Sequence, residues 1–367
     1  MSDNEQEPRL FRTILRDLGQ FFSDLFSGEL FKELKTGLRD LREYFLDQNR
    51  EKKLDTVGRV RRGIYLTWWL FKSLLLRLSS YRRILLIIAL YLLFTGNTQG
   101  GNSNGRMIIG ASIFLFIILL ELKDKLLARD ELEAGRKIQE AIIPDRNPQV
   151  PGWNIWLFTR SANDVGGDLV DIISIDQDRY GLTIGDVAGK GLPAALLMTK
   201  LQATIRALAP DFRSLSKLAA KINAIFYRDS LPSRFASLIF LELTTKKDII
   251  RFVNCGHFPP FLIKQDQITE MGKGAPALGI MADVDFSEHT ISLNKDELFF
   301  IYSDGLTESR NEKGEFFGDD RLKKLLPDLL GLNAEEAGQK VLQAISRFSG
   351  DARQNDDLSL IILRRDV

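Results

Sequence analysis

Residues 180–198 read YGLTIGDVAGKGLPAALLM, and this stretch decides the fold. Its first residues, 180–184, are apolar and favour a strand. Asp186 stands where that strand ends, and the glycines that follow it predict a turn. The chain then continues as a predicted helix over residues 193–207. An acidic side chain at the junction of a strand and a turn is a local arrangement that the second half of the chain repeats.

Short apolar segments separated by turns continue on both sides of this stretch. The predicted strands cover residues 153–159, 169–175, 180–184, 235–243, 249–254, 297–302 and 358–363. The predicted helices cover residues 193–207, 214–227, 320–330 and 334–348. Many consecutive strands with few helical crossovers predict an α+β domain with mainly antiparallel sheets.

Aspartates stand beside small residues at the edges of four predicted strands. They are Asp168, Asp186, Asp304 and the pair Asp356-Asp357. One Asp-Gly pair is usually only a turn, but adjacent strands can bring several such ends together. Clustered carboxylates repel one another unless a divalent cation lies between them. Oxygen ligands suit Mg²⁺ or Mn²⁺, and a chain with two His and one Cys argues against a conventional zinc site.

Paired hard cations would fit the hydrolysis of a phosphate ester. They polarise a phosphoryl oxygen and lower the pKa of bound water, which makes a nucleophile near neutral pH. Hydrolysis of a phosphate ester then needs no Ser/His or Cys/His nucleophile. The four acidic positions therefore predict a metal-dependent phosphatase.

Five ordered motifs resemble one known family. They are GGDLVD from residue 166, GDVAGKGLPAALLM from 185, NCGHFPPFL from 254, YSDGLTESRNEKGEFFG from 302 and NDDLSLIIL from 355. Together they resemble the SpoIIE/RsbU branch of the metal-dependent (PPM, type 2C-like) protein phosphatases. The preceding ARDELEAGRKIQEAIIP resembles the helix that leads into such domains, so the likeness covers approximately residues 127–365.

The resemblance implies a site and a substrate. Asp186 would bridge two Mn²⁺ or Mg²⁺ ions and Val187 would add its backbone carbonyl. Asp304 and Asp356 would complete one metal, and Asp168 would serve the other directly or through water. The implied fold is a sandwich of two antiparallel sheets flanked by helices. The implied substrate is phosphoserine or phosphothreonine on a STAS-type anti-sigma-factor antagonist in a partner-switching pathway.

The chain departs from the family pattern at several positions. Leu169 and Val170 replace the usual aromatic pair, and Ser359 replaces the usual threonine of the last motif. Ala188 stands where many relatives in the wider superfamily have a histidine proposed as leaving-group acid. No arginine is clearly assigned to phosphate, and Arg160 is a guess.

Other motifs have simpler interpretations. The segment 185–191 fails the spacing of a nucleotide-binding GxxxxGK[ST] loop, which argues against an ATPase. Lys190 is either a cation at the edge of the site or a solvated side chain. His257 is interpreted as a structural turn residue, His289 as a surface residue of an alternating strand, and Cys255 as a small buried side chain.

The first 144 residues pose a different problem from the rest. Amphipathic helices are predicted over residues 9–46, and the basic stretch 50–62 is either a linker or a contact for anionic lipid. Residues 64–78 predict an interfacial helix, and two uncharged runs predict a transmembrane hairpin at about 82–98 and 106–122. Basic residues flank the hairpin, so the positive-inside rule places both ends in the cytoplasm. A buried hairpin of a non-membrane domain is the alternative.

These patterns predict four regions. They are a helical region at 1–63, a membrane region at 64–122, a helical linker at 123–144 and a phosphatase domain at 145–367. We therefore expect an all-α, membrane-associated N-terminal region, a multi-pass location in the cytoplasmic (inner) membrane and contact with membrane lipid. The apolar stripe of the linker permits a homodimer, and a shift of the linker could reposition the GGD segment.

Composition limits the partners. A net charge of +1 gives no argument for nucleic acid, and one cysteine cannot form an internal disulfide, which suits a reducing compartment. Two other functions stay open from sequence. One is a non-catalytic membrane scaffold with the phosphatase fold, and the other is a phosphatase of small phosphorylated metabolites.

Overall fold

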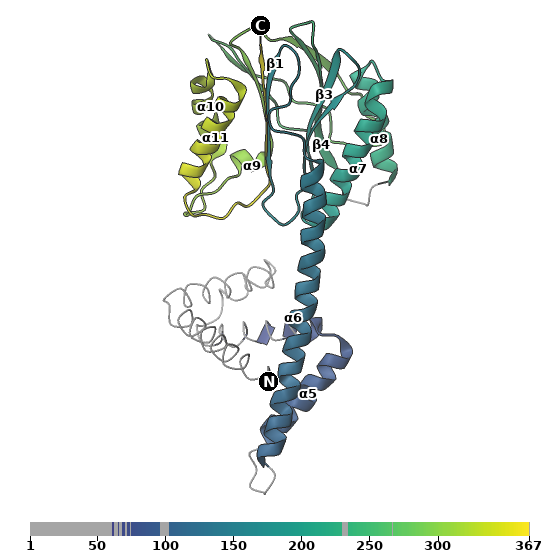
Figure 1. Cartoon of the computed structure of the whole chain (residues 1–367), viewed down its shortest axis with the longest axis vertical. Coiled ribbons are helices and arrows are strands. Elements are labelled where there is room, and N and C mark those ends of the chain that lie inside the picture. The colour runs from purple at the N-terminus through teal and green to yellow at the C-terminus, as the bar shows by residue number, and fades with distance from the viewer. Residues whose placement is uncertain are drawn as a thin grey trace, which may run out of the picture. The chain divides into compact units, whose positions relative to one another are not determined.

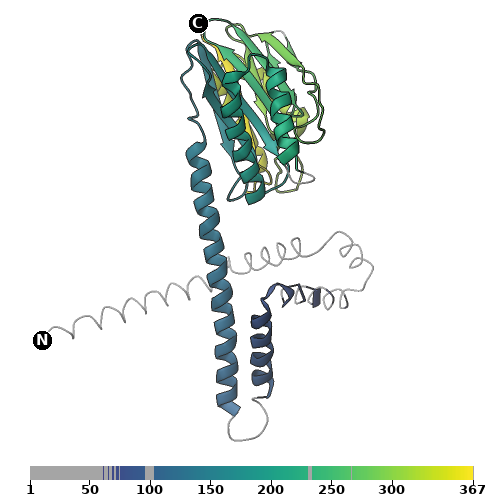
Figure 2. The same ribbon diagram turned by 90° about the vertical axis from the view of Figure 1, so that its right-hand side faces the viewer.

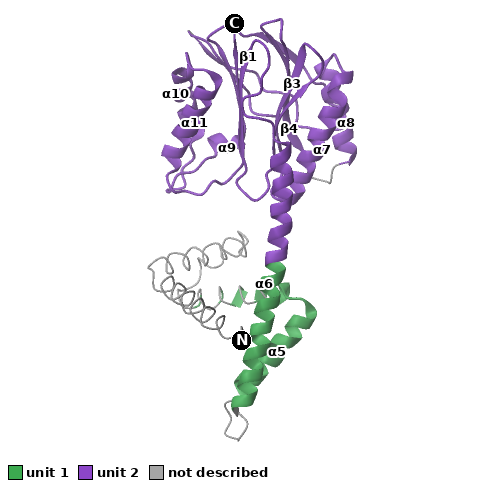
Figure 3. Cartoon of the chain, viewed as in Figure 1, with its two compact units in different colours: residues 1–125 green, residues 126–367 purple. Residues whose placement is uncertain are grey.

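A computed structural model describes residues 61, 65, 68–69, 72–73, 75–95, 103–229, 234–265 and 267–366. The chain divides into two compact units, Met1–Lys125 and Leu126–Val367 (Figure 3). The amphipathic helices predicted at 9–46 lie outside the described residues. The predicted interfacial helix at 64–78 is described only in part, and its described residues up to 77 are helical.

Two helices lie side by side in the first unit (Figures 1 and 2). α5 spans Ser80–Thr95, and α6 spans Ser103–Ile142, so the boundary between the units falls within α6. A Cβ on Gly110 of α6 would come 3.0 Å from the carbonyl oxygen of Ala89 in α5. The helices thus approach closely at a residue without a side chain.

Charge also joins these two helices. The buried guanidinium of Arg82 pairs with the carboxylates of Glu121 and Asp124, each at 2.6 Å. Most large apolar side chains of α5 and of the first half of α6 face outward, among them Ile87, Tyr91, Phe94, Ile108, Leu115 and Leu119. The helical hairpin of the prediction is present, and its insertion in a membrane stays a prediction.

One helix among the described residues is long and apolar enough to cross a membrane, at 104–142, with a mean hydropathy of 2.1 in its most apolar window. α5 has 16 residues, fewer than the ~20 that a span needs. The predicted pair of spans therefore reduces to one helix of sufficient length. α6 also continues through the boundary predicted between the second span and the linker, because no proline occurs before Pro144.

The second unit is built on two five-stranded antiparallel sheets (Figure 1). The first sheet has the order β1 (Trp153–Arg160), β10 (Leu358–Arg365), β9 (Leu298–Tyr302), β6 (Phe261–Ile263), β7 (Ile268–Glu270). The second has the order β2 (Asp168–Ser174), β3 (Arg179–Val187), β4 (Ala236–Thr244), β5 (Ile249–Cys255), β8 (Glu288–Ser292). This confirms the predicted α+β class.

The core between the sheets follows from the two-residue period of the strands. Every second side chain points inward, and the resulting cluster includes Ile155, Leu157, Val170, Leu182, Ile184, Ile239, Leu241, Phe299, Ile301, Ile361 and Leu363. At one end of the sandwich, the inward-pointing positions of the strands are occupied by polar residues instead of apolar ones. These polar positions form the candidate site.

Helices cover the outer face of each sheet (Figures 1 and 2). The second sheet carries α7 (Leu192–Leu208) and α8 (Leu215–Asp229), with the 3-10 turn Ala209–Asp211 between them. The first sheet carries α9 (Asp304–Thr307), α10 (Gly318–Leu325), the 3-10 turn Leu326–Leu329 and α11 (Ala334–Ser349). Trp156 is fully buried under α11, at a point where any Cβ on Gly338 would overlap its ring.

The predicted strands and helices of this unit agree with the structure to within a few residues. The strand β8 (Glu288–Ser292) was predicted only as the alternating strand that holds His289, without bounds. The strands β6 and β7 and the helix α9 were not predicted. Each has only three or four residues, too few for a periodic pattern to stand out from the loop around it.

Candidate active site

The second sheet contributes two aspartates that lie opposite each other. Asp168 is the first residue of β2, and Asp186 is the last but one of β3; the two are register partners. Both therefore point to the same face of the sheet, toward the gap between the sheets. The backbone ahead of Asp168 approaches closely, because a Cβ on Gly167 would lie 3.2 Å from the carbonyl oxygen of Val187 and 3.4 Å from Asp186 Oδ1.

The first sheet contributes aspartates from two neighbouring strands. Asp304 begins α9 directly after β9, and Asp356 and Asp357 directly precede β10. The backbone N–H of Ser303 donates to the carbonyl oxygen of Ser359 at 3.0 Å and extends the β9–β10 pairing to this end. A Cβ on Gly305 would overlap the backbone of Asp357, so only glycine permits this approach.

Hydrogen bonds join the two sheets at the same end. The carboxylate of Asp357 accepts from the backbone N–H groups of Gly167 at 2.6 Å and of Ala162 at 2.8 Å. The hydroxyl of Ser359 donates to Asp168 Oδ2 at 2.5 Å. The segments that carry Asp168 and Asp357 are thus held together although 189 positions separate them in the chain.

Burial and like charge act together on these carboxylates. Burial, followed by the charges of Asp304 and Asp356, raises the pKa of Asp186 to about 7. Burial and the charge of Asp356 raise the pKa of Asp304 to about 6. Burial and the charge of Asp186 raise the pKa of Asp168 well above its ordinary value. These aspartates therefore lie close enough to repel one another.

An anionic cluster of this kind fits a cation. Asp168 Oδ1 is buried and has no hydrogen-bond partner, and the donors are all oxygens, which hard divalent ions prefer. Within the described part of the chain, no three Asp, Glu, His or Cys side chains are yet arranged closely enough to hold a metal ion. The structure brings the four predicted aspartates to one end of the sandwich, and their role as ligands remains a proposal.

The two aspartates of the last motif differ in their surroundings. Asp357 is buried and is occupied by backbone donors, whereas Asp356 is partly exposed and pairs with the ammonium of Lys190 at 2.8 Å. The charge of Asp356 acts on both Asp186 and Asp304, and its predicted role as a metal ligand stays a prediction. Lys190 lies at the edge of the site, which is the first of the two interpretations of this residue.

Three residues contribute to the site besides the aspartates predicted as metal ligands. Asp357 and Ser359 connect the sheets, and the buried amide of Gln139 in α6 bonds both backbone groups of Gly166, with its Nε2 at 2.8 Å from the carbonyl oxygen and its Oε1 at 3.0 Å from the N–H. The second aspartate of NDD was a visible signal for Asp357. No local pattern marks Gln139, since its partner lies 27 residues away.

The remaining candidates have defined surroundings. His257 is buried, and its Nδ1 lies 2.8 Å from the hydroxyl of Ser237; burial lowers the pKa of His257 to about 4, so the ring is neutral at pH 7. Cys255 is a buried free thiol, as predicted. His289 stacks on Phe252 and is half-buried, so it is not a simple surface residue. Arg160 is exposed, and its Nε donates to Gln354 Oε1 at 2.6 Å.

The raised carboxyl pKa values predict how stability depends on pH when chelator has removed metal. An unfolded aspartate titrates near ~3.9, whereas Asp186 and Asp304 titrate at about 7 and about 6 in the folded protein. Between these limits the folded state binds more protons than the unfolded state, so stability increases as the pH falls from about 8 to about 5. Melting temperatures of the chain in EDTA at pH 5.5, 7 and 8.5 measure this. A melting temperature that increases as the pH rises from 5.5 to 8.5 would contradict the clustering.

The fold and the site together define a class. Two stacked antiparallel sheets with helices on both outer faces and aspartates from both sheets at one end are the features of a PP2C-like protein phosphatase. Solved structures agree on the fold. The SiaA-PP2C domain of Pseudomonas aeruginosa aligns with 66% of this chain and 99% of its own length, at a TM-score of 0.58 and 19% identity. The PP2C phosphatase domain of SpoIIE from Bacillus subtilis, with a fragment of its regulatory domain, aligns with 60% of this chain and 64% of its own length, at a TM-score of 0.52 and 17% identity.

Sequence comparison gives the family. The Stage II sporulation protein E (SpoIIE) family matches residues 176–366, and the chain belongs to this family of protein phosphatases. The phosphoserine phosphatase RsbU of Bacillus subtilis is 26% identical over 241 residues, which cover 65% of this chain and 71% of RsbU. The phosphoserine phosphatase RsbP of the same organism is 30% identical over 190 residues, 50% of this chain and 46% of RsbP. The chain thus spans less than half of RsbP.

Proposed function

We propose that this chain hydrolyses phosphoserine or phosphothreonine on a protein, with two Mn²⁺ or Mg²⁺ ions held at the acidic end of the sandwich. One observation carries the proposal: strand ends from both sheets bring Asp168, Asp186, Asp304 and Asp356 together, and burial with like charge raises the pKa of Asp168, Asp186 and Asp304. Such a cluster is costly unless it binds cations. The family membership supplies the reaction class.

The proposed ligands follow from the position of each oxygen. Asp186 lies between the two sheets and interacts with aspartates of both, which suits a bridging ligand. The carbonyl oxygen of Val187 faces the same backbone position, Gly167, as Asp186 Oδ1. Asp304 and Asp356 would serve one ion and Asp168 the other. When bound, such ions activate water and polarise the phosphoryl group.

Other residues of the chain hold the proposed metal ligands in position. Asp357 holds the GGD turn through the backbone N–H of Gly167 and the segment before it through that of Ala162, and Ser359 orients Asp168. Lys190 adds a positive charge beside Asp356. No described histidine is placed to donate a proton to the leaving group, because Ala188 follows Val187 and the ring of His257 is neutral and buried. We therefore propose that solvent protonates the leaving group.

We also propose where the enzyme works and on what. A STAS-type anti-sigma-factor antagonist in a partner-switching pathway is the proposed substrate, supported by the likeness to two proteins named phosphoserine phosphatase. The apolar outward faces of α5 and α6 support anchoring as a hairpin in the cytoplasmic membrane. The bonds from Gln139 to Gly166 connect the linker helix directly to the GGD turn. A homodimer that forms through this helix would affect the site through these bonds.

A comparison of two substrates tests the proposal. We expect the purified full chain with Mn²⁺ to hydrolyse both p-nitrophenyl phosphate and a phosphoserine peptide. Asp304→Asn should lower both rates by at least about 10²-fold, since it removes one proposed metal ligand. Phosphate release measures the rates. A wild-type chain that binds Mn²⁺ but releases no phosphate from either substrate would instead support a scaffold that retains the fold.

A further inference from the structure

A groove opens beside the aspartate cluster on the side of the first sheet. Its volume is about 360 Å³, and it lies between the end of β1, the segment after α9, the last turns of α11 and the segment before β10. Its walls are about equally polar and apolar, and the polar part is formed by Arg160, Ser309, Arg310, Ser346, Ser349 and Gln354. The groove is large enough for one or two amino-acid side chains but is open to solvent along one side.

Two guanidinium groups in this groove lack an acidic partner. None of the ion pairs between described residues includes Arg160 or Arg310. Arg160 uses its Nε for Gln354, and Arg310 lies 4.7 Å above the ring of Phe316, a contact that neutralises no charge. The groove therefore has two positive charges in its lining that no described acidic side chain pairs with.

The groove is bonded directly to the segments that carry the catalytic aspartates. Gln354 Nε2 donates to the carbonyl oxygen of Asp356 at 2.7 Å. The hydroxyl of Ser309 donates to the carbonyl oxygen of Gly305, next to Asp304, also at 2.7 Å. A residue seated in the groove would thus be a near neighbour of the phosphorylated residue whose phosphate reaches the aspartates.

One carboxylate lies close to the groove. A Cβ on Gly350, which lines the groove, would come 3.0 Å from Glu312 Oε1. Glu312 forms no ion pair with any described residue, and its carboxylate accepts the backbone N–H of Asp351 at 3.3 Å. Two unpaired arginines against one unpaired glutamate leave this part of the surface with a net positive charge, which favours an anionic ligand.

We infer that this groove binds an acidic side chain of the phosphoprotein substrate, next to the residue that is dephosphorylated. The inference rests on the proposed function and names a specificity subsite for it. Arginine donors match the geometry of a carboxylate, and a partly enclosed pair of this kind gives both affinity and selection. The chain would accordingly prefer phosphoserine with a Glu or Asp neighbour over phosphoserine with a neutral or basic one.

Matched peptides and charge reversal test the inference. Three phosphoserine peptides differ only at the two positions flanking phosphoserine, which carry Glu, Gln or Lys, and the full chain with Mn²⁺ is assayed for kcat/KM on each. We expect wild type to favour the Glu peptide over the Gln peptide by about tenfold, mainly through KM, which corresponds to ~1.4 kcal/mol. Arg310→Gln should remove most of this preference, and Arg310→Glu should make the Lys peptide the better substrate.

A second arginine serves as the control. Arg321 lies 4.7 Å above the ring of Phe348, the same distance as Arg310 from Phe316, and it donates to the carbonyl oxygens of Phe316 and Phe317 but does not line the groove. Arg321→Gln changes the net charge equally and should keep the wild-type preference. Equal kcat/KM on the three peptides, with normal turnover of each, would overturn the proposed binding of an acidic side chain in the groove and leave the phosphatase proposal intact. A wild-type chain that hydrolyses neither the peptides nor p-nitrophenyl phosphate would overturn the proposed function itself.

Discussion

Asp186→Asn is expected to lower the turnover of a phosphoserine peptide by at least about 10³-fold, or ~4 kcal/mol of activation free energy. Asp186 interacts with three other carboxylates, since the charges of Asp304, Asp356 and Asp357 all raise its pKa. An amide has the same shape but no charge, so it cannot hold two cations. The measurement is kcat with saturating Mn²⁺.

The same substitution should stabilise the metal-free protein. At pH 8 the ionised Asp186 is repelled by its neighbours and loses hydration through burial, and both costs vanish in the amide. We therefore expect Asp186→Asn to raise the melting temperature in EDTA at pH 8 while it abolishes activity. Stability that rises as function is lost is typical of residues kept for their chemistry.

Asp171→Asn provides the matched control. Asp171 is a buried aspartate on β2, but Arg206 of α7 binds it through two hydrogen bonds at 2.8 and 2.6 Å. Here the substitution removes a partnered charge, so it should lower the melting temperature and leave kcat nearly unchanged. A fall in melting temperature for both variants would contradict the idea that Asp186 is held in a strained anionic cluster.

The sequence predicted the local features of this site well. The strand that begins at Asp168 and the strands that lead to Asp186 and Asp304 have regular apolar residues and lie next to turns that contain glycine, so their positions follow from short-range patterns. Within each sheet, the pairing of neighbouring strands brings two of these strand ends together, as in β2 with β3 and in β9 with β10. That the ends of the two sheets then meet depends on how the sheets stack, which no short-range pattern indicates.

Features that depend on distant contacts could not be predicted in the same way. Asp357 and Ser359 bond to segments about 190 residues earlier in the chain, and nothing near them indicates those partners. The groove is formed by residues from 160 to 354 that only the folded sheet and α11 bring together. The short strand β6 fills a place between β9 and β7 that no periodicity marks. The sequence therefore indicates the candidate metal ligands, and the fold is needed to see what positions them.

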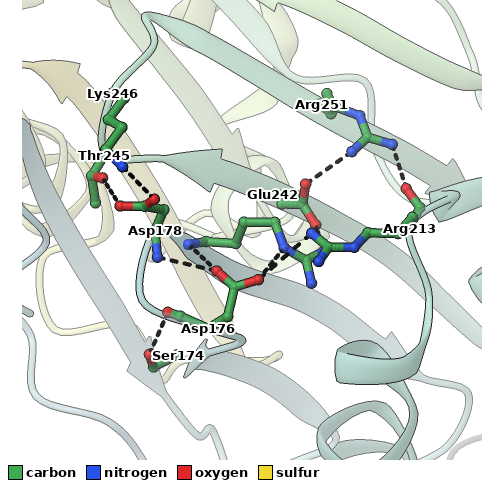
Figure 4. Close-up of polar contacts among 9 residues, drawn as sticks. Ser174, Asp176, Asp178, Arg213, Glu242, Thr245, Lys246 and Arg251 are labelled. Atoms are coloured by element: carbon green, nitrogen blue, oxygen red, sulfur yellow. Dashed lines mark hydrogen bonds and ion pairs between the residues drawn. The ribbon is translucent and has the colours of Figure 1, made fainter.

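Glu242→Ala is expected to destabilise the second unit by about 3–5 kcal/mol, the cost of breaking a buried ion pair. Glu242 on β4 is almost completely buried. Its two oxygens pair with Arg179 of β3 at 2.8 Å and with Arg251 of β5 at 2.9 Å, and Figure 4 shows this network. Arg179 is itself buried, so removal of Glu242 leaves a desolvated charge with only the partly exposed Asp176 beside it.

The network also holds the start of α8. Arg251 bonds Glu288 of β8 and donates to the carbonyl oxygen of Arg213, and Glu288 accepts the backbone N–H of Leu215 at 2.9 Å. Without Glu242, Arg251 keeps only its bonds to Glu288 and to the carbonyl oxygen of Arg213. Hydrogen exchange followed by mass spectrometry should therefore show faster exchange in β4, in β5 and in the first turn of α8.

An exposed pair in the same region is the control. Lys246 pairs with Asp178 at 2.6 Å, but both side chains are exposed, so Lys246→Ala should cost no more than about 1 kcal/mol. Glu242→Gln keeps hydrogen-bonding atoms without the charge and should fall between the two. A Glu242→Ala cost as small as that of Lys246→Ala would show that water replaces the carboxylate. Because Glu242 lies near the end of β4 remote from the aspartates, folded Glu242→Ala protein should keep its turnover at low temperature, so that stability and catalysis are lost separately.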